Sequence, residues 1–361
     1  MTTRNVEQAT VLEALRVVRD PDLGKDIVSL DFVKELRIDK GEVSFAIELT
    51  TPACPVKEQM HDEAVAAVSR LSGVTKVTVN MTANVRAVAS PEAGRAPIDG
   101  VKNVVAVGAG KGGVGKSTVA VNLALALSSY GGRVGIIDAD VYGPNIPIML
   151  GVSAKLETDG KKIVPAQCYG IPVVSMGFLT QDETPIIWRG PMLHGIVQQF
   201  FREVRWDELD YLVVDMPPGT GDVCLSLSQT VPVSGAVIVT TPQVVSLADS
   251  RRAVAMYRKL NVPVLGLVEN MSHFVCPSCD QESDIFGKGG GQTASEEMGI
   301  PFLGRIPLYQ PIREGGDSGR PIIDAEPNSA AARAFFEVAE RTAAQVSITA
   351  LSSSVPIATA S

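Results

Sequence analysis

Hydrophobic and polar positions alternate over short distances in the first part of the chain. Apolar residues at helical spacing predict a helix over Val6–Arg19, which stops at Asp20-Pro21. Alternating positions in Val33–Ile38 and Glu42–Leu49, on either side of the turn Asp39-Lys40-Gly41, predict a β-hairpin.

A second helix and a third strand follow in the same region. Thr51–Pro55 opens the helix, and Lys76–Met81 alternates as the strand. The apolar stripe of the helix consists of Val56, Met60, Ala64, Val68 and Leu71. We therefore expect residues 1–86 to form a small α+β domain. Residues 87–100, which are rich in Pro, Gly and small polar residues, are expected to form a linker.

From Val101 onward, continuous apolar runs bounded by turn residues replace the alternation. Such runs are typical of parallel strands that are buried on both faces. They lie at Val104–Val107, Val134–Ile137, Tyr211–Val214, Ala236–Val239 and Val264–Val268. Helical segments separate several of them, so we expect residues 101–345 to form an α/β domain, with a mostly parallel sheet flanked by helices. Residues 346–361, rich in Ser, Ala and Thr, are expected to form a flexible tail.

The composition excludes several classes of protein. With 45% hydrophobic and 20% charged residues, the chain is expected to be globular. A net charge of −8 argues against a nucleic acid partner, and no apolar stretch is long enough to span a membrane. The five cysteines, an odd number with one close pair, are not typical of a disulfide framework. We therefore expect a cytoplasmic protein in a reducing environment.

A phosphate-binding loop lies between the first apolar run and the next helix. Gly110–Ser117 fits G-x-x-x-x-G-K-[ST], with a strand before it and helix Thr118–Tyr130 after it. The glycines allow backbone N–H groups to surround phosphates, and the helix N-terminus adds partial positive charge. Lys116 is expected to reach the β- and γ-phosphates, and the Ser117 hydroxyl to bind Mg²⁺. The predicted nucleotide-binding residues of this segment are Gly110, Lys111, Gly112, Gly113, Val114, Gly115, Lys116, Ser117 and Thr118.

Lys111 is a cation that a phosphate-binding loop does not require. It is either a solvated surface charge or a group that reaches the phosphates of a second subunit. In the second case it would stabilise charge on the transferred phosphoryl group, as an arginine finger does.

Acidic residues follow two of the predicted strands. Asp215 ends the run Tyr211–Val214, where a carboxylate can hold Mg²⁺ through water. Asp138 and Asp140 follow Val134–Ile137 at the same edge of the sheet, and one of them could orient an attacking water. For Asp140 the alternative is helix capping or solvation of the loop.

These motifs resemble a known family. Gly110–Thr118 resembles the deviant Walker A motif of the SIMIBI class, which includes the MinD/ParA ATPases. Within that class the chain is most similar, over about residues 100–340, to the Mrp/ApbC iron–sulfur carrier ATPases. The further matching motifs are Asp138–Pro144, Ser175–Phe178, Trp188–Met192, Asp215–Asp222, Glu269–Ser272 and Cys276–Cys279. Residues 1–86 resemble the MIP18-like (DUF59) domain of iron–sulfur assembly, through Asp20–Asp22 and Leu49–Pro55.

The resemblance implies a homodimer that sandwiches ATP, with Lys111 crossing to the partner subunit. It also implies that Asp140 lies near the hydrolytic water, that Asp215 belongs to the Mg²⁺ site and that Asn270 contacts the adenine. Gly219–Asp222 would form a switch segment. The catalytic residues of the expected slow ATPase are Lys111, Lys116 and Asp140.

Cys276-Pro277-Ser278-Cys279 places two thiolates on one tight turn. Zinc and iron–sulfur clusters generally take four ligands, and the chain has no second C-x-x-C pair. A twofold dimer would supply four, so the residues predict a metal centre that bridges two subunits. A redox pair and a bridged zinc aided by His273 are the alternatives. The resemblance specifies a [4Fe–4S] cluster, and the nearby Gly287–Gly291 is interpreted as a flexible loop.

Cys54 lies between two prolines at a predicted helix start, where the helix dipole would favour its thiolate. It is a candidate accessory thiol for cluster handling, and the alternative is a buried small residue. Cys168 and Cys224 have no partner pattern and are expected to lie in the core.

The leading hypothesis is an ATP-hydrolysing carrier that holds a [4Fe–4S] cluster at a dimer interface and passes it to apoproteins. Its expected partners are recipient apoproteins and cluster assembly factors, with neither nucleic acid nor a membrane. The alternative is a positioning or partition ATPase of the MinD/ParA kind without a cluster. A metabolic kinase would need an acceptor pocket that the sequence does not identify.

Overall fold

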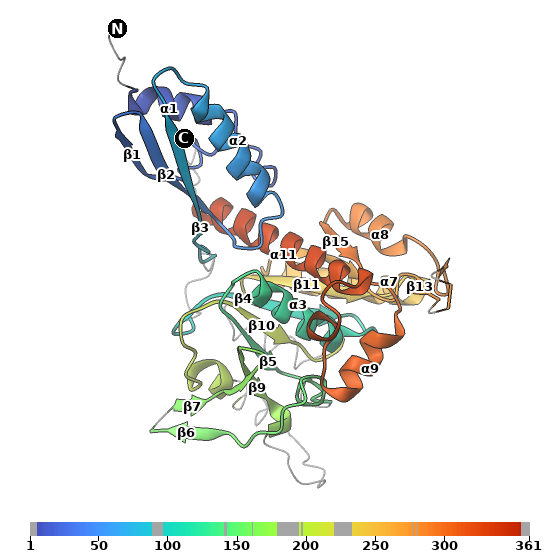
Figure 1. Ribbon diagram of the computed structural model, residues 1–361. Helices are drawn as coiled ribbons and strands as arrows, with labels where there is room; N and C mark the ends of the chain where they lie inside the picture. Colours follow the sequence, from blue (N-terminus) through green and yellow to red (C-terminus); the bar gives the residue numbers. More distant parts are fainter. Residues whose placement is uncertain are drawn as a thin grey trace, which may run out of the picture. The chain divides into compact units, whose positions relative to one another are not determined.

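The chain divides into two compact units, Met1–Arg86 and Ala87–Ser361 (Figure 1). The computed structural model describes residues 6–88, 97–140, 143–160, 162–178, 195, 198–219, 233–276, 278–279 and 281–354. Residues 89–96 of the predicted linker and residues 355–361 of the predicted tail lie outside these ranges.

The N-terminal unit is a three-stranded sheet with two helices, as the mixed pattern predicts. Its helices are α1 (Gln8–Leu15) and α2 (Lys57–Ser69), and its strands are β1 (Val33–Asp39), β2 (Glu42–Leu49) and β3 (Lys76–Ala83). The strand order is β1-β2-β3, with β1 antiparallel and β3 parallel to the central β2. The helix α2 is the crossover that a parallel β2–β3 pair requires.

Local backbone geometry explains where these elements end. Lys40 and Gly41 have φ values of 46° and 88°, which the tight turn of the β1–β2 hairpin requires. The predicted helix over Val6–Arg19 was too long, because α1 ends at Leu15. There the chain turns back, since the Val18 N–H donates to Leu15 and Arg19 forms a bridge with Asp26.

The second unit contains an eight-stranded sheet, in the order β15-β12-β11-β4-β10-β5-β9-β8. The five predicted apolar runs are all confirmed as strands, namely β4 (Val101–Ala109), β5 (Val134–Asp138), β10 (Leu209–Asp215), β11 (Gly235–Thr240) and β12 (Val264–Glu269). Three further strands were not predicted, namely β8 (Ala166–Cys168), β9 (Ile171–Ser175) and β15 (Phe302–Arg305). Every neighbouring pair is parallel except β8–β9.

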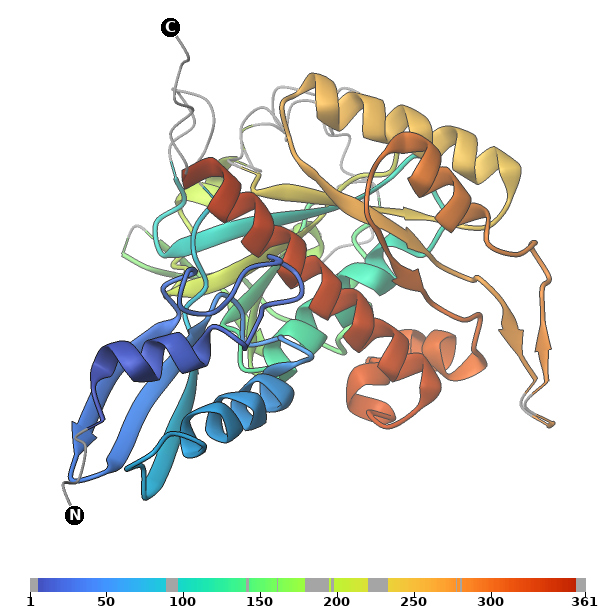
Figure 2. The ribbon, with the colours of Figure 1, turned by 90° about the horizontal axis from the view of Figure 1, so that it is seen from above.

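Helices cover both faces of this sheet. The helix α3 (Lys116–Ser129) packs with α11 (Ala330–Ser354), whereas α7 (Val244–Lys259) packs with α8 (Gly290–Met298) (Figure 2). The chain moves from β4 toward β5 through α3, and in the opposite direction from β11 to β12 through α7. Right-handed crossovers in opposite directions place their helices on opposite faces. The carboxyl edge where this direction reverses is the usual ligand position in such folds.

Short elements connect this framework. They are α4 (Ile146–Met149), η1 (Met176–Phe178), α9 (Gln310–Ser318), α10 (Ile322–Ala325), the pair β6 (Glu157–Asp159) and β7 (Lys162–Val164), and the pair β13 (Phe274–Val275) and β14 (Glu282–Ser283). Within the described ranges, no helix combines the length and apolar composition that crossing a bilayer requires.

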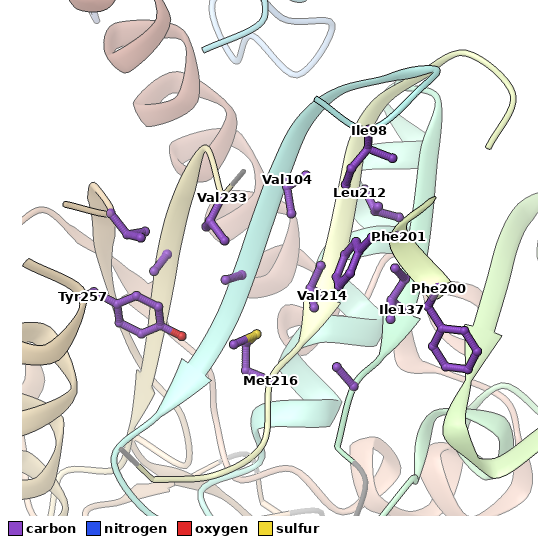
Figure 3. Close-up of a cluster of buried hydrophobic side chains, with 14 of the residues drawn as sticks. Ile98, Val104, Ile137, Phe200, Phe201, Leu212, Val214, Met216, Val233 and Tyr257 are labelled. Carbon is purple, nitrogen blue, oxygen red and sulfur yellow. The ribbon is translucent and has the colours of Figure 1, made fainter. Parts of the chain in front are cut away.

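Side chains from the central strands form a buried core on the face that α7 covers (Figure 3). Val104, Leu212 and Ile137 contribute from β4, β10 and β5, and Tyr257 contributes from α7. A Cβ at Gly108 of β4 would lie 2.7 Å from the Tyr257 hydroxyl, so glycine allows this helix to approach the sheet. Each such apolar side chain contributes about 1.5–3 kcal/mol on burial.

The prediction of a flexible tail from Val346 was wrong for residues 346–354, because α11 continues through Ser354. Val346 and Ala350 are buried and extend, at helical spacing, the stripe that includes Val338.

Val346→Asp is expected to lower the free energy of unfolding by about 3 kcal/mol, because it places a carboxylate in the interface beneath α11. Urea denaturation followed by circular dichroism measures this change. Ser352→Asp, at an exposed position of the same helix, is the matched control and should cost less than about 1 kcal/mol. Equal stability of both variants would show that residues 346–354 do not pack as described.

Candidate nucleotide site and cysteine turn

The predicted phosphate-binding loop connects β4 to α3. Gly113 and Gly115 have φ values of 79° and 82°, and Gly115 is the residue that caps the helix. A Cβ at Gly110 would lie 2.2 Å from the Asp249 carbonyl oxygen, whereas one at Gly112 or Gly113 would meet nothing within 4 Å. The loop therefore packs tightly on α7 at its start and leaves open space beside its centre.

A buried ionic network joins the loop to the ends of two neighbouring strands. The Lys116 ammonium lies 2.6 Å from Asp215 Oδ1 and 3.5 Å from Asp140 Oδ2. The Ser117 hydroxyl donates to Asp215 Oδ2 over 2.6 Å. Burial raises the pKa of the Asp215 carboxyl, and the Lys116 charge opposes this shift. The structure thus brings together the predicted phosphate lysine, the predicted Mg²⁺ ligands and the predicted catalytic aspartate.

Asp138 fixes the loop that follows β5 through hydrogen bonds. Its carboxylate accepts hydrogen bonds from the backbone N–H groups of Asp140 and Ile146 and from the Ser175 hydroxyl. Burial raises its pKa to about 7, and the nearby Asp215 carboxylate acts in the same direction. Because all these donors are internal, Asp138 holds the backbone that carries Asp140, and Asp140 remains the candidate to orient water.

Asp140 has one carboxylate oxygen without a hydrogen-bond partner among the described residues. Its side chain is buried, and Oδ1 makes no hydrogen bond to any residue that the structure describes. An orphaned buried carboxylate oxygen is costly unless water or another donor binds it. The neighbouring residues 141–142 lie outside the described part of the chain.

The site fits a nucleotide with Mg²⁺. The Ser117 hydroxyl and Asp215 Oδ2 are 2.6 Å apart, so the Asp215 carboxylate lies where it can hold, through water, an Mg²⁺ ion bound to Ser117. The open space at Gly112 and Gly113 leaves backbone N–H groups available to phosphate oxygens. One ammonium pairs with two carboxylates here, so a divalent cation would also balance the local charge.

A cavity of about 380 Å³ adjoins the phosphate loop, within the range of small-ligand pockets. Thr118 forms its wall nearest the loop, Asn270 and Met271 follow β12, and Leu308 and Tyr309 follow β15. Apolar side chains line it together with the amides of Asn145 and Asn270, and this mixture suits a flat heterocycle.

Asn270 joins this cavity to the phosphate loop. Its side-chain Nδ2 donates to the Val114 carbonyl over 2.8 Å, and a Cβ at Gly115 would lie 2.1 Å from the same nitrogen. Glycine at position 115 is therefore needed both for its backbone angle and for this contact. The predicted contact of Asn270 with adenine stays a prediction, and its place on the cavity wall supports it.

The remaining predicted elements of the nucleotide site are only partly described. Lys111 is half-buried and forms no ion pair with a residue in the described ranges. Gly219 lies beside the loop, and its N–H donates to the Ala109 carbonyl. Residues 220–222 of the predicted switch and the motif Trp188–Met192 lie outside the described residues.

The cysteine pair lies on the turn between the short strands β13 and β14. Cys276 is half-buried and Cys279 is exposed, and both are free thiols. The Ser278 backbone N–H, followed by contacts from Cys279, lowers the pKa of the Cys276 thiol. Among the described residues there is no group of three or more His, Cys, Asp or Glu that could hold a metal ion. The two thiols on this turn therefore need ligands from elsewhere to complete a four-ligand site.

The other cysteines differ in their surroundings. Cys54 is half-buried and packs against the apolar core of the N-terminal unit, which favours the structural alternative. Cys168 lies in β8, its thiol contacts the Leu150 carbonyl, and burial raises its pKa. Cys224 lies outside the described residues.

Sequence analysis gave no role to several residues that shape the site, and it named Ser175 and Glu269 only as parts of matching motifs. Ser175 of β9 donates to Asp138 on the neighbouring strand β5, and Leu308 and Tyr309 line the cavity. Glu269 is fully buried at the end of β12 and accepts a hydrogen bond from the Gly291 N–H. Gly290 and Gly291 begin helix α8, so the interpretation of Gly287–Gly291 as a flexible loop was wrong for these two residues. An acidic residue at the end of an apolar run was the available signal for Glu269.

Two family models match the chain. One, described as NUBPL iron-transfer P-loop NTPase, covers residues 100–343, and the other, described as iron-sulfur cluster assembly protein, covers residues 8–80. An iron-sulfur cluster carrier protein of Synechocystis is 50% identical over 94% of this chain and 98% of its own length. A protein of the same name in Deinococcus radiodurans is 48% identical over 95% of this chain and 96% of its own length.

A solved structure shares the fold of the second unit. A nucleotide-binding protein of Archaeoglobus fulgidus, in complex with ADP, superposes with a TM-score of 0.56 and 38% sequence identity. The match covers 62% of this chain and 88% of that one.

Lys116→Ala is expected to weaken binding of MgADP at least about 100-fold, because two or more charge-assisted contacts of about 1.5–3 kcal/mol each are lost. Isothermal titration calorimetry measures this affinity. Lys259→Ala, at an exposed position of α7, is the control and should bind as the unaltered protein does. Undiminished binding by Lys116→Ala would exclude Gly110–Ser117 as the phosphate site.

Proposed function

We propose that this chain, which belongs to the family of NUBPL iron-transfer P-loop NTPases, is an ATP-hydrolysing carrier of iron–sulfur clusters. The observation that carries the proposal is the presence, in one unit, of the buried Lys116–Asp215 pair at a glycine-rich loop and of two free thiols on one turn. Relatives named as cluster carriers, which match nearly the full length of the chain, support the cargo. The second family match, over the N-terminal unit, supports a role in cluster assembly.

Nucleotide binding would rearrange the ionic network around Lys116. The ammonium now pairs with Asp215 and Asp140, so it would exchange carboxylate oxygens for phosphate oxygens. Ser117 and Asp215 would hold Mg²⁺, which would neutralise charge on the phosphates. The base would occupy the cavity beside Asn270.

Hydrolysis would depend on Asp140. Its oxygen Oδ1, which makes no hydrogen bond within the described ranges, can accept one from water and so orient the water for attack on the γ-phosphorus. The hydrogen bond from the Asp140 N–H to the Asp138 carboxylate would hold the backbone of Asp140 during this step. Lys111, which has no ion pair among described residues, is available to reach the phosphates of a second copy of the chain.

Cluster binding would require a homodimer. Cys276 and Cys279 supply two ligands, and a twofold axis would bring two more from the partner subunit. Four thiolates suit a [4Fe–4S] cluster, which is the cargo and leaves with a recipient apoprotein. A site that needs free thiols requires a reducing compartment, and the cytoplasm is such a compartment.

The double variant Cys276→Ala/Cys279→Ala is expected to lose at least about nine-tenths of the iron and sulfide that the unaltered protein binds, because these two thiolates are the only protein ligands proposed. Anaerobic reconstitution followed by iron, sulfide and zinc analysis measures this. Cys168→Ala removes one thiol from β8 and should leave the content unchanged. Equal iron and sulfide in the double variant would end the cluster assignment, and zinc in their place would make the site a zinc site.

Asp140→Asn is expected to lower ATP turnover about 100-fold while changing MgADP affinity only a few-fold, because it removes charge from the group that orients water. Steady-state phosphate release and calorimetry separate the two quantities. Asp159→Asn, on the exposed strand β6, is the matched control. Turnover by Asp140→Asn at the unaltered rate would remove its catalytic role.

A further inference from the structure

The cavity and the cysteine turn are connected by a very short segment of chain. The segment Asn270–Cys276, here called the strap, begins at the cavity wall and ends at the first thiol. Asn270 is fixed at its start, since its N–H donates to Thr240 and its amide to Val114. Met271 follows with φ of 54° and lines the cavity.

The strap pairs with the segment that follows β15, and part of that segment lines the same cavity. The Ser272 N–H and hydroxyl both donate to the Ile306 carbonyl, and the Leu308 N–H donates to the His273 carbonyl over 2.7 Å. Phe274 then forms a parallel bridge with Leu308. Strands β12 and β15 are parallel neighbours, so this pairing extends their ladder beyond the sheet. A ligand in the cavity would therefore touch both members of the ladder that carries the thiols.

The chain returns from the cysteine turn to the point where the strap begins. After β14 it reaches α8, whose Gly291 N–H donates to the Glu269 carboxylate next to Asn270. A Cβ at Gly291 would lie 2.8 Å from Glu269 Cβ, so the contact is close. The other oxygen, Oε1, makes no hydrogen bond to a described residue, and Arg305 Nε lies 3.9 Å away. A fully buried carboxylate depends on such partners, so Glu269 and α8 hold each other.

We propose that the strap transmits occupancy of the nucleoside cavity to Cys276 and Cys279, with Glu269 as the positioning residue that holds the returning end. This inference rests on the proposed function, in which a carrier needs the reactivity of its two cluster-binding thiols to depend on bound nucleotide. Both ends of the segment 270–291 meet at the end of β12. Filling the cavity fixes Met271 and Leu308, and the ladder that includes them then opens less often.

The expected signature is a slower reaction of the two thiols when nucleotide is bound. Iodoacetamide alkylation of the cluster-free full chain, followed by peptide mass spectrometry, gives a separate rate for each cysteine. Saturating MgADP is expected to slow Cys276 and Cys279 at least about fivefold, at the lower end of typical coupling between two sites. Cys54, in the other unit, is the internal reference and should not respond.

Variants of Glu269 test whether the slower alkylation depends on the contact between Glu269 and α8. Glu269→Ala removes the acceptor for Gly291 and is expected to bring the rate ratio with and without MgADP close to one. Glu269→Gln keeps an oxygen acceptor and should restore most of the response. Glu297→Gln makes the same chemical change at an exposed position of α8 and should leave the response intact. If Glu269→Ala does not fold, Ser272→Ala serves instead and should at least halve the response, because it removes the hydroxyl bond to Ile306.

Two results would overturn the inference. One is unchanged or faster alkylation of Cys276 and Cys279 in the unaltered protein at a MgADP concentration that calorimetry shows to be saturating. The other is a full response in Glu269→Ala or Ser272→Ala. Neither result depends on a cluster, so this inference and the cluster assignment fail separately. Loss of iron binding would end the carrier function and leave these rates unaffected.

Discussion

The buried cation Lys116 determines how the site is arranged. Its ammonium pairs with Asp215 at the end of β10 and with Asp140 after β5, so one charge joins the phosphate loop to two strands. The same region buries Asp138, whose pKa rises to about 7 because burial and Asp215 disfavour its charged form. The cluster has more carboxylates than cations. Such an arrangement is suited to a ligand that arrives with Mg²⁺, since the divalent ion balances the excess negative charge.

Much of this arrangement could be predicted from sequence, because it depends on local patterns. Continuous apolar runs located β4, β5, β10, β11 and β12, and parallel strands bring their carboxyl ends to one edge. The residues that end these runs, including Asp215, therefore fell near the phosphate loop. The strands that escaped prediction are short. Pro172 interrupts the pattern of β9, and β15 has only four residues.

Other features depend on contacts between distant segments, which a sequence pattern does not contain. The Asp138–Ser175 bond joins β5 to β9, and residues that follow β12 and β15 line the cavity. Composition assigned Val346 and Ala350 to a tail. Both residues belong to α11 and are buried because this helix packs on one face of the sheet. The anchoring of α8 on Glu269 likewise joins residues that flank the entire cysteine segment. This last contact ties the chain that returns from the cysteine turn to the end of β12, next to the cavity residue Asn270.

The central claim is that the chain with this phosphate site binds a cluster jointly with a second copy of itself. Native mass spectrometry of the anaerobically reconstituted full-length protein tests it most directly, because one spectrum gives both the number of chains and the mass of the cargo. The account predicts a species of two chains that carries one cluster of four irons and four sulfides. A single chain with its own cluster, or two chains with a cluster each, would contradict it.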